Sequence, residues 1–253
     1  YQRYNPNSHS LNDEIVEKIV QNPAVTKAGK IQTMEVPMHA SKAERSNIIK
    51  EYEAKDASGV SRIESMADNP QWIKGYETFK ETGNYTGIIT GIDGLALEIL
   101  LNAPSNDGEF DADQFATGNY VIAASAYATD FISTPPVGSK ITVGDREFEI
   151  MMTHPQHSTL ITGSNSSQAA FSISYYVPSA VFRELYPDCG IRNVVIDIAP
   201  EQQTSFEKEL NRLLANTNVA VTLRSDYQWN FRNALFHQQI IPLLIGCVLL
   251  LIG

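Results

Sequence analysis

The sequence predicts an α+β fold in which two α/β segments, one near each end of the chain, enclose a β-rich middle. Three observations lead to this expectation. An amphipathic helical pattern that begins near residue 11 is followed by an alternating strand pattern. Short apolar runs separated by Gly, Pro and Asp fill the middle of the chain. In the last third, strand-like runs again alternate with helical patterns, so the first and last segments can form one discontinuous subdomain with the middle inserted into it.

The first segment contains a predicted helix over residues 11–21 and a predicted strand over residues 29–38. Ser10 is the expected N-cap of the helix, with Asp13 three residues further on as in a capping box. The apolar residues of the helix fall on one stripe, which consists of Leu11, Ile15, Val16, Ile19 and Val20. Asn22-Pro23 is expected to end the helix.

Residues 40–82 are polar and of mixed charge, and they predict helices. The clearest candidate runs from Ser41 to Asp56. Further on, apolar residues recur at helical spacing at Trp72, Ile73, Tyr76 and Phe79. We interpret this second pattern as a helix that packs its aromatic face on a sheet.

Short strands are predicted through the middle of the chain. They cover residues 86–93, 95–102, 119–125, 139–143 and 146–152. The last two are joined through Gly144-Asp145, which is a strong signal for a tight β-hairpin. A Gly/Asp-rich turn precedes the strand at residue 119, and Pro135-Pro136 marks a bend.

The last third predicts a strand ending at Pro178, a short helix over residues 179–186, and a buried strand over residues 193–198. An amphipathic helix follows Pro200 and continues to about Ala215; its apolar face consists of Phe206, Leu210, Leu213 and Leu214. A further strand is predicted over residues 219–223, and residues 224–239 are expected to form a helix that continues into the apolar end of the chain.

The apolar run from Ile240 to Gly253 contains no charged residue. It is shorter than the about 20 residues that span a bilayer, but it is apolar up to its last residue. We expect it to be the beginning of a transmembrane helix; a buried core helix and an artefact of the chain's end are the alternatives. Residues 1–10 lack the pattern of a signal peptide, so the targeting information of an exported domain is expected upstream.

The net charge argues against a nucleic-acid-binding protein, and the two cysteines argue against a disulfide-stabilised one. The net charge is −10, and no cluster of Lys and Arg of the kind that neutralises phosphates is found, so nucleic acid is not an expected partner. Cys247 lies within the apolar run and Cys189 lies in a predicted loop, so a disulfide between them is not expected.

The best candidate metal site is the alternating acidic series Asp107, Glu109, Asp111 and Asp113. Calcium favours several oxygens on one tight loop. However, the EF-hand pattern requires Gly at the position of Ala112 and a terminal Glu that this chain lacks. A solvated acidic turn is therefore the preferred interpretation, with a calcium site as the alternative.

No other motif predicts chemistry. His154 and His157 flank a proline and lack a third ligand, so we expect an exposed loop; His9, His39 and His237 are isolated. The Gly/Ser run over residues 163–167 lacks the nucleophile-elbow pattern. No nucleotide-binding glycine motif occurs. We therefore expect a non-catalytic chain without a cofactor.

The final third resembles the extracytoplasmic domain of MacB/FtsX-type ABC transporter permeases. The resemblance lies in the succession G-S-K-I-T-V, R-E-F-E-I, Y-Y-V-P with a short helix, N-V-V-I-D-I, a long amphipathic helix, V-A-V-T-L, and a helix that enters an apolar run. A-V-T-K-A-G-K-I-Q-T-M-E-V is similar to the segment after the first membrane helix of these permeases, and F-D-A-D-Q-F-A-T-G-N-Y-V-I-A is similar to the stretch before their Gly-rich hairpin. The charged stretch at residues 40–82 fits the family least.

This resemblance implies a discontinuous α/β porter-like lobe, formed by residues 1–39 and 174–223, and a β-rich sabre-like inserted lobe, formed by residues 40–173. Residues 224–253 would be a C-terminal stalk helix and the start of a transmembrane segment. It also implies a permease that pairs with a second copy and with a cytoplasmic ATPase subunit, and that acts on an unidentified extracellular substrate or protein partner. No catalytic residue is implied.

The leading hypothesis is therefore a non-catalytic external domain that couples ATP hydrolysis mechanically to an event outside the membrane. The residues expected to carry this coupling are in the stalk: Tyr227, Trp229, Phe231 and Leu235. Ordinary packing at the base of a domain is the alternative role of each. The alternative function is a membrane-anchored ligand-binding or sensor domain without a transporter, and a surface hydrolase is a third.

Overall fold

A computed structural model describes residues 11–102, 105, 107–125, 134–154, 172–215, 217, 219 and 221. The chain divides into two compact units, residues 1–210 and residues 211–253. Of the second unit, the structure describes the last turn of one helix and a few residues after it. There, the Thr217 hydroxyl donates to the Leu214 carbonyl at 2.8 Å.

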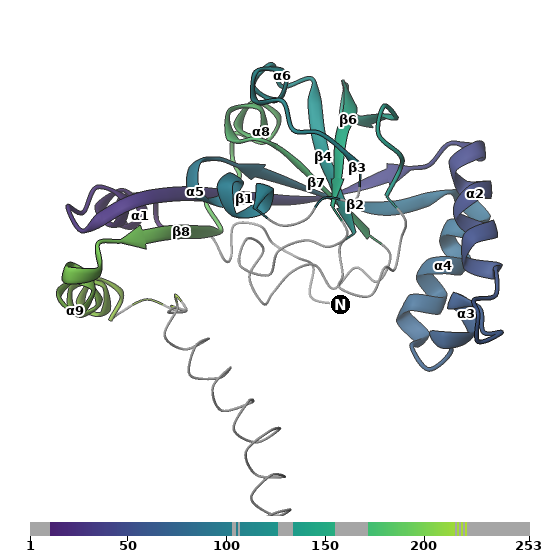
Figure 1. The fold of residues 1–253 in the computed structure, drawn as a ribbon, viewed down its shortest axis with the longest axis horizontal. Coiled ribbons are helices and arrows are strands. Elements are labelled where there is room, and N and C mark those ends of the chain that lie inside the picture. The colour runs from purple at the N-terminus through teal and green to yellow at the C-terminus, as the bar shows by residue number, and fades with distance from the viewer. Residues whose placement is uncertain are drawn as a thin grey trace, which may run out of the picture. The chain divides into compact units, whose positions relative to one another are not determined.

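The first unit is built on one mixed sheet, in which the described residues form eight strands (Figure 1). The neighbours run in the order β3-β6-β4-β7-β2-β1-β8, and β5 pairs with β6. Two pairs, β2 with β7 and β4 with β6, are parallel, and the others are antiparallel. The strands are β1 Val25–His39, β2 Asn84–Ile92, β3 Asp107–Gly108, β4 Tyr120–Ser125, β5 Lys140–Val143, β6 Arg146–His154, β7 Ser172–Pro178 and β8 Asn193–Ile198.

The longest strand, β1, is shared between two partners. Its first part, from Val25 to Ile31, pairs with β8, and its second part, from Ile31 to His39, pairs with β2. The predicted strand over residues 29–38 lies inside β1. The predicted hairpin is confirmed as well, because Val143 pairs with Arg146 and Gly144 adopts a φ of 62°.

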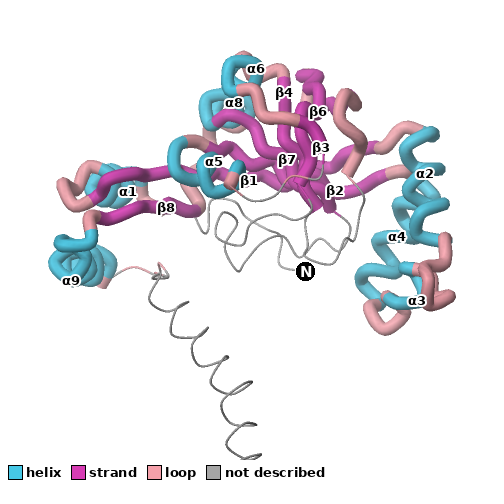
Figure 2. The backbone as a smooth tube through the Cα atoms, viewed as in Figure 1, coloured by secondary structure: helices cyan, strands magenta, loops and turns pink. Residues whose placement is uncertain are grey.

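Helices cover both faces of the sheet (Figure 2). Successive side chains of a strand point to opposite faces, and β4 shows this directly. Val121 and Ala123 belong to an apolar cluster with α2, α4 and α8, whereas Ile122 and Ala124 belong to a second cluster with α5 and α6. The helices are α1 Asp13–Val20, α2 Lys42–Glu53, α3 Arg62–Ser65, α4 Pro70–Thr82, α5 Gly94–Leu101, α6 Ala112–Ala116, α8 Ser179–Leu185 and α9 Gln203–Leu214, the last preceded by a 3-10 turn at Pro200–Gln202.

One predicted strand is wrong. Residues 95–102 were expected to be extended, but Gly94–Leu101 forms the helix α5. Periodicity does not distinguish a short apolar run in a buried helix from one in a buried strand. The deciding feature is the close packing of α5 on β1: a Cβ atom at Gly94 would lie 2.2 Å from the Ala28 carbonyl oxygen, and one at Gly29 would lie 2.3 Å from the Ala96 nitrogen.

One smaller expectation also needs correction, and another falls largely outside the described residues. The N-cap of α1 is Asn12 rather than Ser10, because the Asn12 side chain accepts from the Glu14 and Ile15 amides. Of the strand predicted over residues 219–223, the structure describes only residues 219 and 221, and neither is in a strand. All three ranges expected to form the two lobes contribute strands to the one sheet, and β7 crosses residue 173; the lobe boundaries stay a prediction.

Candidate functional site

Residues 40–83, here called the helical insertion, interrupt the hairpin of β1 and β2. The last pair of that hairpin is His39 with Asn84, and the Ala40 amide donates to the Gly83 carbonyl at 2.9 Å. Gly83 ends α4 with a φ of 77°, a conformation that favours glycine. The insertion therefore leaves the sheet at Ala40 and returns to it at Gly83, and these two residues are neighbours in space.

Two capping boxes fix the starts of helices in the insertion. Ser41 and Glu44 form the first, at α2, and Ser61 and Glu64 form the second, at α3. In each box the serine hydroxyl accepts the glutamate amide, and the glutamate carboxylate accepts the serine amide at 2.7–2.8 Å. The two glutamates thus have the same local role in two different surroundings.

An aromatic cluster holds α2 against α4. The rings of Trp72 and Tyr76 stack at 5.6 Å between centroids, and the Tyr52 ring meets both edge-on at 5.9 and 6.0 Å. The Arg62 guanidinium lies over the Tyr52 ring at 5.1 Å, and Lys80 pairs with Glu53 at the rim. The predicted aromatic helix is confirmed, but its face packs on α2 as well as on the sheet.

The insertion meets the sheet at Phe79 and Tyr85. Their rings contact edge-on, with centroids 6.4 Å apart. The Tyr85 hydroxyl in turn shares a 2.9 Å hydrogen bond with the hydroxyl of Tyr175 on β7. Burial raises the pKa of Tyr85 to about 12, and burial also raises the pKa of Tyr175 well above its ordinary value. Both hydroxyls are therefore neutral at physiological pH.

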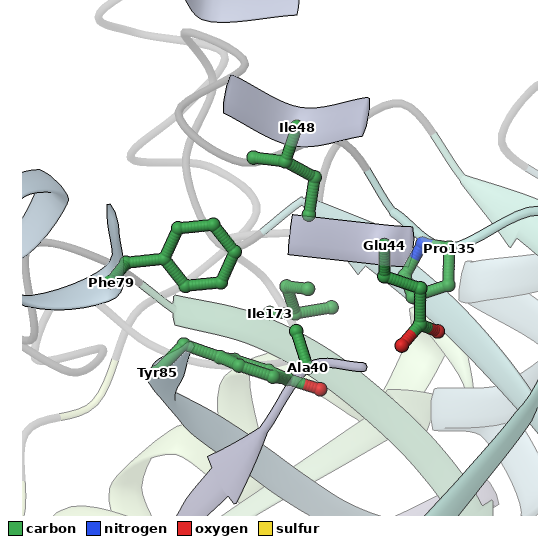
Figure 3. A pocket seen from close by; sticks show the side chains of 7 residues that line it. All are labelled: Ala40, Glu44, Ile48, Phe79, Tyr85, Pro135 and Ile173. Atoms are coloured by element: carbon green, nitrogen blue, oxygen red, sulfur yellow. The ribbon is translucent and has the colours of Figure 1, made fainter. Parts of the chain in front are cut away.

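A small hollow lies at this junction (Figure 3). It is bordered by helical residues of α2 and α4, by β2 and β7, and by the segment before β5. Its volume available to a water-sized molecule is about 10 Å³, which is the room that one water needs. The lining consists of Ala40, Glu44, Ile48, Phe79, Tyr85, Pro135 and Ile173.

Glu44 is the charged residue of this lining. One of its carboxylate oxygens accepts the Ser41 amide at 2.8 Å. Among the described residues Glu44 has no ion pair, whereas Glu51 and Glu53 on the same helix pair with Arg62 and Lys80. The hollow therefore combines an unpaired carboxylate with aromatic and aliphatic walls.

Two residues of the acidic series, Asp107 and Asp111, accept hydrogen bonds from backbone amides. Asp107 lies in β3, and its side chain accepts the Gly108 amide; Asp111 is the N-cap of α6, and its side chain accepts the Gln114 amide at 2.9 Å. Asp113 lies in the first turn of α6, and Glu109 lies between the two elements. Within the part of the chain that the structure describes, no three His, Cys, Asp or Glu residues are grouped to hold a metal ion.

The histidine expectation is corrected at one position. His154 is the last residue of β6 and is buried, with 1% of its surface exposed, so it is not in an exposed loop. β6 continues two residues beyond the predicted end at residue 152, and residues 150–154 are all buried, so the strand carries the ring into the interior. His39 is exposed on the surface; His9, His157, His237 and the Gly/Ser run at 163–167 lie outside the described residues.

The predicted coupling residues Tyr227, Trp229, Phe231 and Leu235 also lie outside the described residues, as does the apolar run with Cys247. None of the helices in the described part of the chain is long and apolar enough to span a bilayer. Cys189 lies in the loop between α8 and β8, as predicted, and is buried, without a disulfide to any described residue; its carbonyl accepts a hydrogen bond from the Gln32 side-chain amide at 2.7 Å.

Sequence reasoning did not find the hollow. The motif Ser41-x-x-Glu44 signals a capping box but says nothing about what lies beyond the carboxylate. Tyr85 and Ile173 join the site only through the parallel pairing of β2 with β7, in which Thr86 is opposite Ser172. That pairing connects residues far apart in the chain, and no local pattern reports it.

Comparison with known proteins gives likenesses in structure only. No family model matches the chain, and no curated protein matches it. One similar solved structure is the extracellular domain of the noncanonic ABC-type transporter YknZ from Gram-positive bacteria, with 14% identity, 81% of this chain and 83% of that chain covered, and a TM-score of 0.46.

A second is the periplasmic region of MacB from Actinobacillus actinomycetemcomitans, with 9% identity, 89% of this chain and 84% of that chain covered, and a TM-score of 0.48. Both are external domains of the kind that the sequence resemblance predicts. With scores below 0.5, neither likeness by itself assigns a function to this chain.

Proposed function

We propose that this chain is the external domain of an ABC transporter permease and that it performs no catalysis itself. The observation that carries the proposal is that the first described residues of the first unit lie next to its last segment. The Leu11 amide donates to the Ile191 carbonyl at 2.7 Å, and the Asn22 side chain donates to the Glu209 carboxylate at 3.0 Å. The Ala199 amide donates to the Ala24 carbonyl at 3.0 Å. A domain that is a loop between two membrane helices must enter and leave at one place.

The apolar run at residues 240–253 supports the same proposal, because it supplies a segment suited to a membrane directly after the predicted stalk. In the proposed mechanism, ATP binding and hydrolysis in a cytoplasmic subunit move the stalks of two permease copies. The external domain passes that movement to a substrate or protein partner outside the membrane. Such coupling requires an element with two conformations whose equilibrium depends both on the cytoplasmic ATPase and on the partner outside the membrane.

The first experiment tests the assembly. The full-length protein is purified from its own membrane in mild detergent, and the proteins that accompany it are identified by mass spectrometry. We expect an ATPase subunit that carries nucleotide-binding motifs. A preparation without any ATPase would contradict the transporter role and favour a membrane-anchored sensor or binding domain.

The second experiment tests the mechanical coupling. Asn22→Cys and Glu209→Cys place thiols on the two ends, in a background where Cys189 and Cys247 are replaced by Ser. We expect a reducible bifunctional thiol reagent to stop ATP hydrolysis by the transporter in its membrane and a reductant to restore it. The matched control is Lys27→Cys with Glu98→Cys, a pair whose side chains lie 2.5 Å apart between β1 and α5. Equal inhibition of both pairs, or of neither, would contradict coupled movement at the two ends.

A further inference from the structure

The hollow at the base of the helical insertion is too small for a typical small-molecule ligand. Such sites usually have volumes of about 300–1,000 Å³, whereas this hollow offers about 10 Å³ to a water-sized molecule. The space accommodates one water or one ammonium head group. A planar guanidinium group is larger than the space.

The walls of the hollow favour a cation on an aliphatic stem. The rings of Phe79 and Tyr85 border it, and aromatic faces attract ammonium groups. The aliphatic side chains of Ile48 and Ile173 complete the lining shown in Figure 3. A lysine buries its methylene chain along such apolar surface while it places its charged end next to polar groups.

The charge that a lysine requires is supplied by Glu44. Its carboxylate has no ion pair among the described residues, and its negative charge adds to the effect of burial in raising the pKa of Tyr85. The nearest cation in sequence, Arg45, is engaged elsewhere, because its guanidinium donates to the Glu81 carbonyl at 3.1 Å. The chain as a whole carries a net charge of −10, which attracts basic partners.

We propose that this hollow binds the ammonium group of a lysine side chain presented by a basic polypeptide partner. The carboxylate of Glu44 pairs with the ammonium group, and the rings of Phe79 and Tyr85 and the aliphatic side chains border the space that it enters. This binding concerns the described residues alone and does not depend on the transport role.

The test uses the 253-residue chain in detergent micelles, labelled at the isoleucine δ1 methyl groups. The probe is the peptide acetyl-Gly-Lys-Gly-amide, and the comparison peptides carry norleucine or arginine in place of lysine. We expect the lysine peptide to shift the Ile48 and Ile173 signals saturably. We expect no shift with norleucine, which lacks the charge, and a smaller one with arginine, which exceeds the space.

The decisive variant is Glu44→Gln. Glutamine also completes a capping box, so α2 keeps its start while the charge is removed. We expect the affinity for the lysine peptide to fall by about tenfold or more, because the variant removes the negative partner of one partly buried ion pair. The matched control is Glu64→Gln, which makes the same change in the capping box of α3 and should leave the affinity unchanged.

Three results would overturn the proposal: equal shifts with the norleucine peptide, an affinity that Glu44→Gln leaves unchanged, or no saturable shift with lysine. Equal binding of the arginine peptide would overturn the assignment to lysine. All of these results are obtained without an ATPase or a second permease copy, so they are separate from the outcome of the copurification experiment.

Discussion

The hydroxyl oxygens of Tyr85 and Tyr175 lie 2.9 Å apart in a hydrogen bond that links the first residues of β2 to the middle of β7. Tyr175 is completely buried, whereas Tyr85 is partly exposed. The two partners of this bond are therefore not equivalent, and this inequality leads to the first prediction.

Both Tyr85→Phe and Tyr175→Phe remove the hydrogen bond between the two hydroxyls. Tyr85→Phe should destabilise the domain more than Tyr175→Phe does. In Tyr85→Phe the Tyr175 hydroxyl stays buried without a partner, which costs about 1–3 kcal/mol. In Tyr175→Phe the Tyr85 hydroxyl is nearer to solvent and can bind water. Urea unfolding of both variants and of the double variant measures the difference. A double variant whose cost equals the sum of the single costs would show that the two hydroxyls do not interact.

Tyr176→Phe should change the free energy of unfolding in the opposite direction from Tyr175→Phe. Tyr176 is fully buried on the other face of the sheet, and its hydroxyl has no hydrogen-bond partner in the described structure. Removal of a buried unsatisfied polar group is neutral or stabilising, by about 1 kcal/mol. Urea unfolding with Tyr175→Phe as the adjacent control checks the sign. A clear loss of stability in Tyr176→Phe would mean that the hydroxyl is bonded in solution.

Stability should fall in alkaline solution because of Tyr85 and Tyr175. Burial is the main cause of the raised pKa of Tyr85, about 12 against an ordinary 10.0, and it raises the pKa of Tyr175 as well. The folded state thus holds these protons more tightly than the unfolded state. Their contribution is complete below pH 10 and is lost as the pH rises through the folded pKa, so the free energy of unfolding should decrease from about pH 10 towards pH 12.

The measurement is urea unfolding at several pH values over this interval, together with the tyrosinate absorbance of the folded protein. Tyr85→Phe removes one of the two groups, so its stability should decrease less steeply with pH. Because the other tyrosines are present in both proteins, the difference reports Tyr85. Identical slopes for the two proteins would show that Tyr85 titrates normally.

Gly94→Ala should be more destabilising than Gly138→Ala. Both residues have a positive φ, 47° and 82°, which costs an alanine about 1–2 kcal/mol. At Gly94 the added Cβ would also lie 2.2 Å from the Ala28 carbonyl oxygen, whereas at Gly138 nothing lies within 4 Å. Thermal unfolding should show a loss at Gly94 that exceeds the loss at Gly138. Equal losses would mean that α5 moves away from β1 without cost.

The sequence predicts most local elements because their signals are local. The polar, charge-mixed run from Ser41 to Asp56 and the spacing of Trp72, Tyr76 and Phe79 indicate α2 and α4, and Gly144-Asp145 indicates the hairpin. Where a run was short and mostly apolar, as at residues 95–102, periodicity did not separate helix from strand, and only the packing of α5 on β1 decides.

The candidate site could not be predicted for a different reason. Glu44, Tyr85 and Ile173 belong to three segments that meet only because β2 pairs with β7. Such pairing is set by the global packing of apolar faces, and the residues that it brings together carry no common motif. Each segment therefore has an ordinary sequence, and only the tertiary structure shows that the three residues line one site.

The sharing of β1 between two partners has a mechanical consequence. Its 15 residues form one continuous strand from a point close to Asn22 to the base of the helical insertion at Ala40, a distance of about 50 Å at 3.3 Å per residue. Tension applied where the domain begins therefore reaches the hollow at Glu44 through covalent bonds along a single strand. Along this line the strand can lengthen very little, because its residues are already close to the full span of an extended chain.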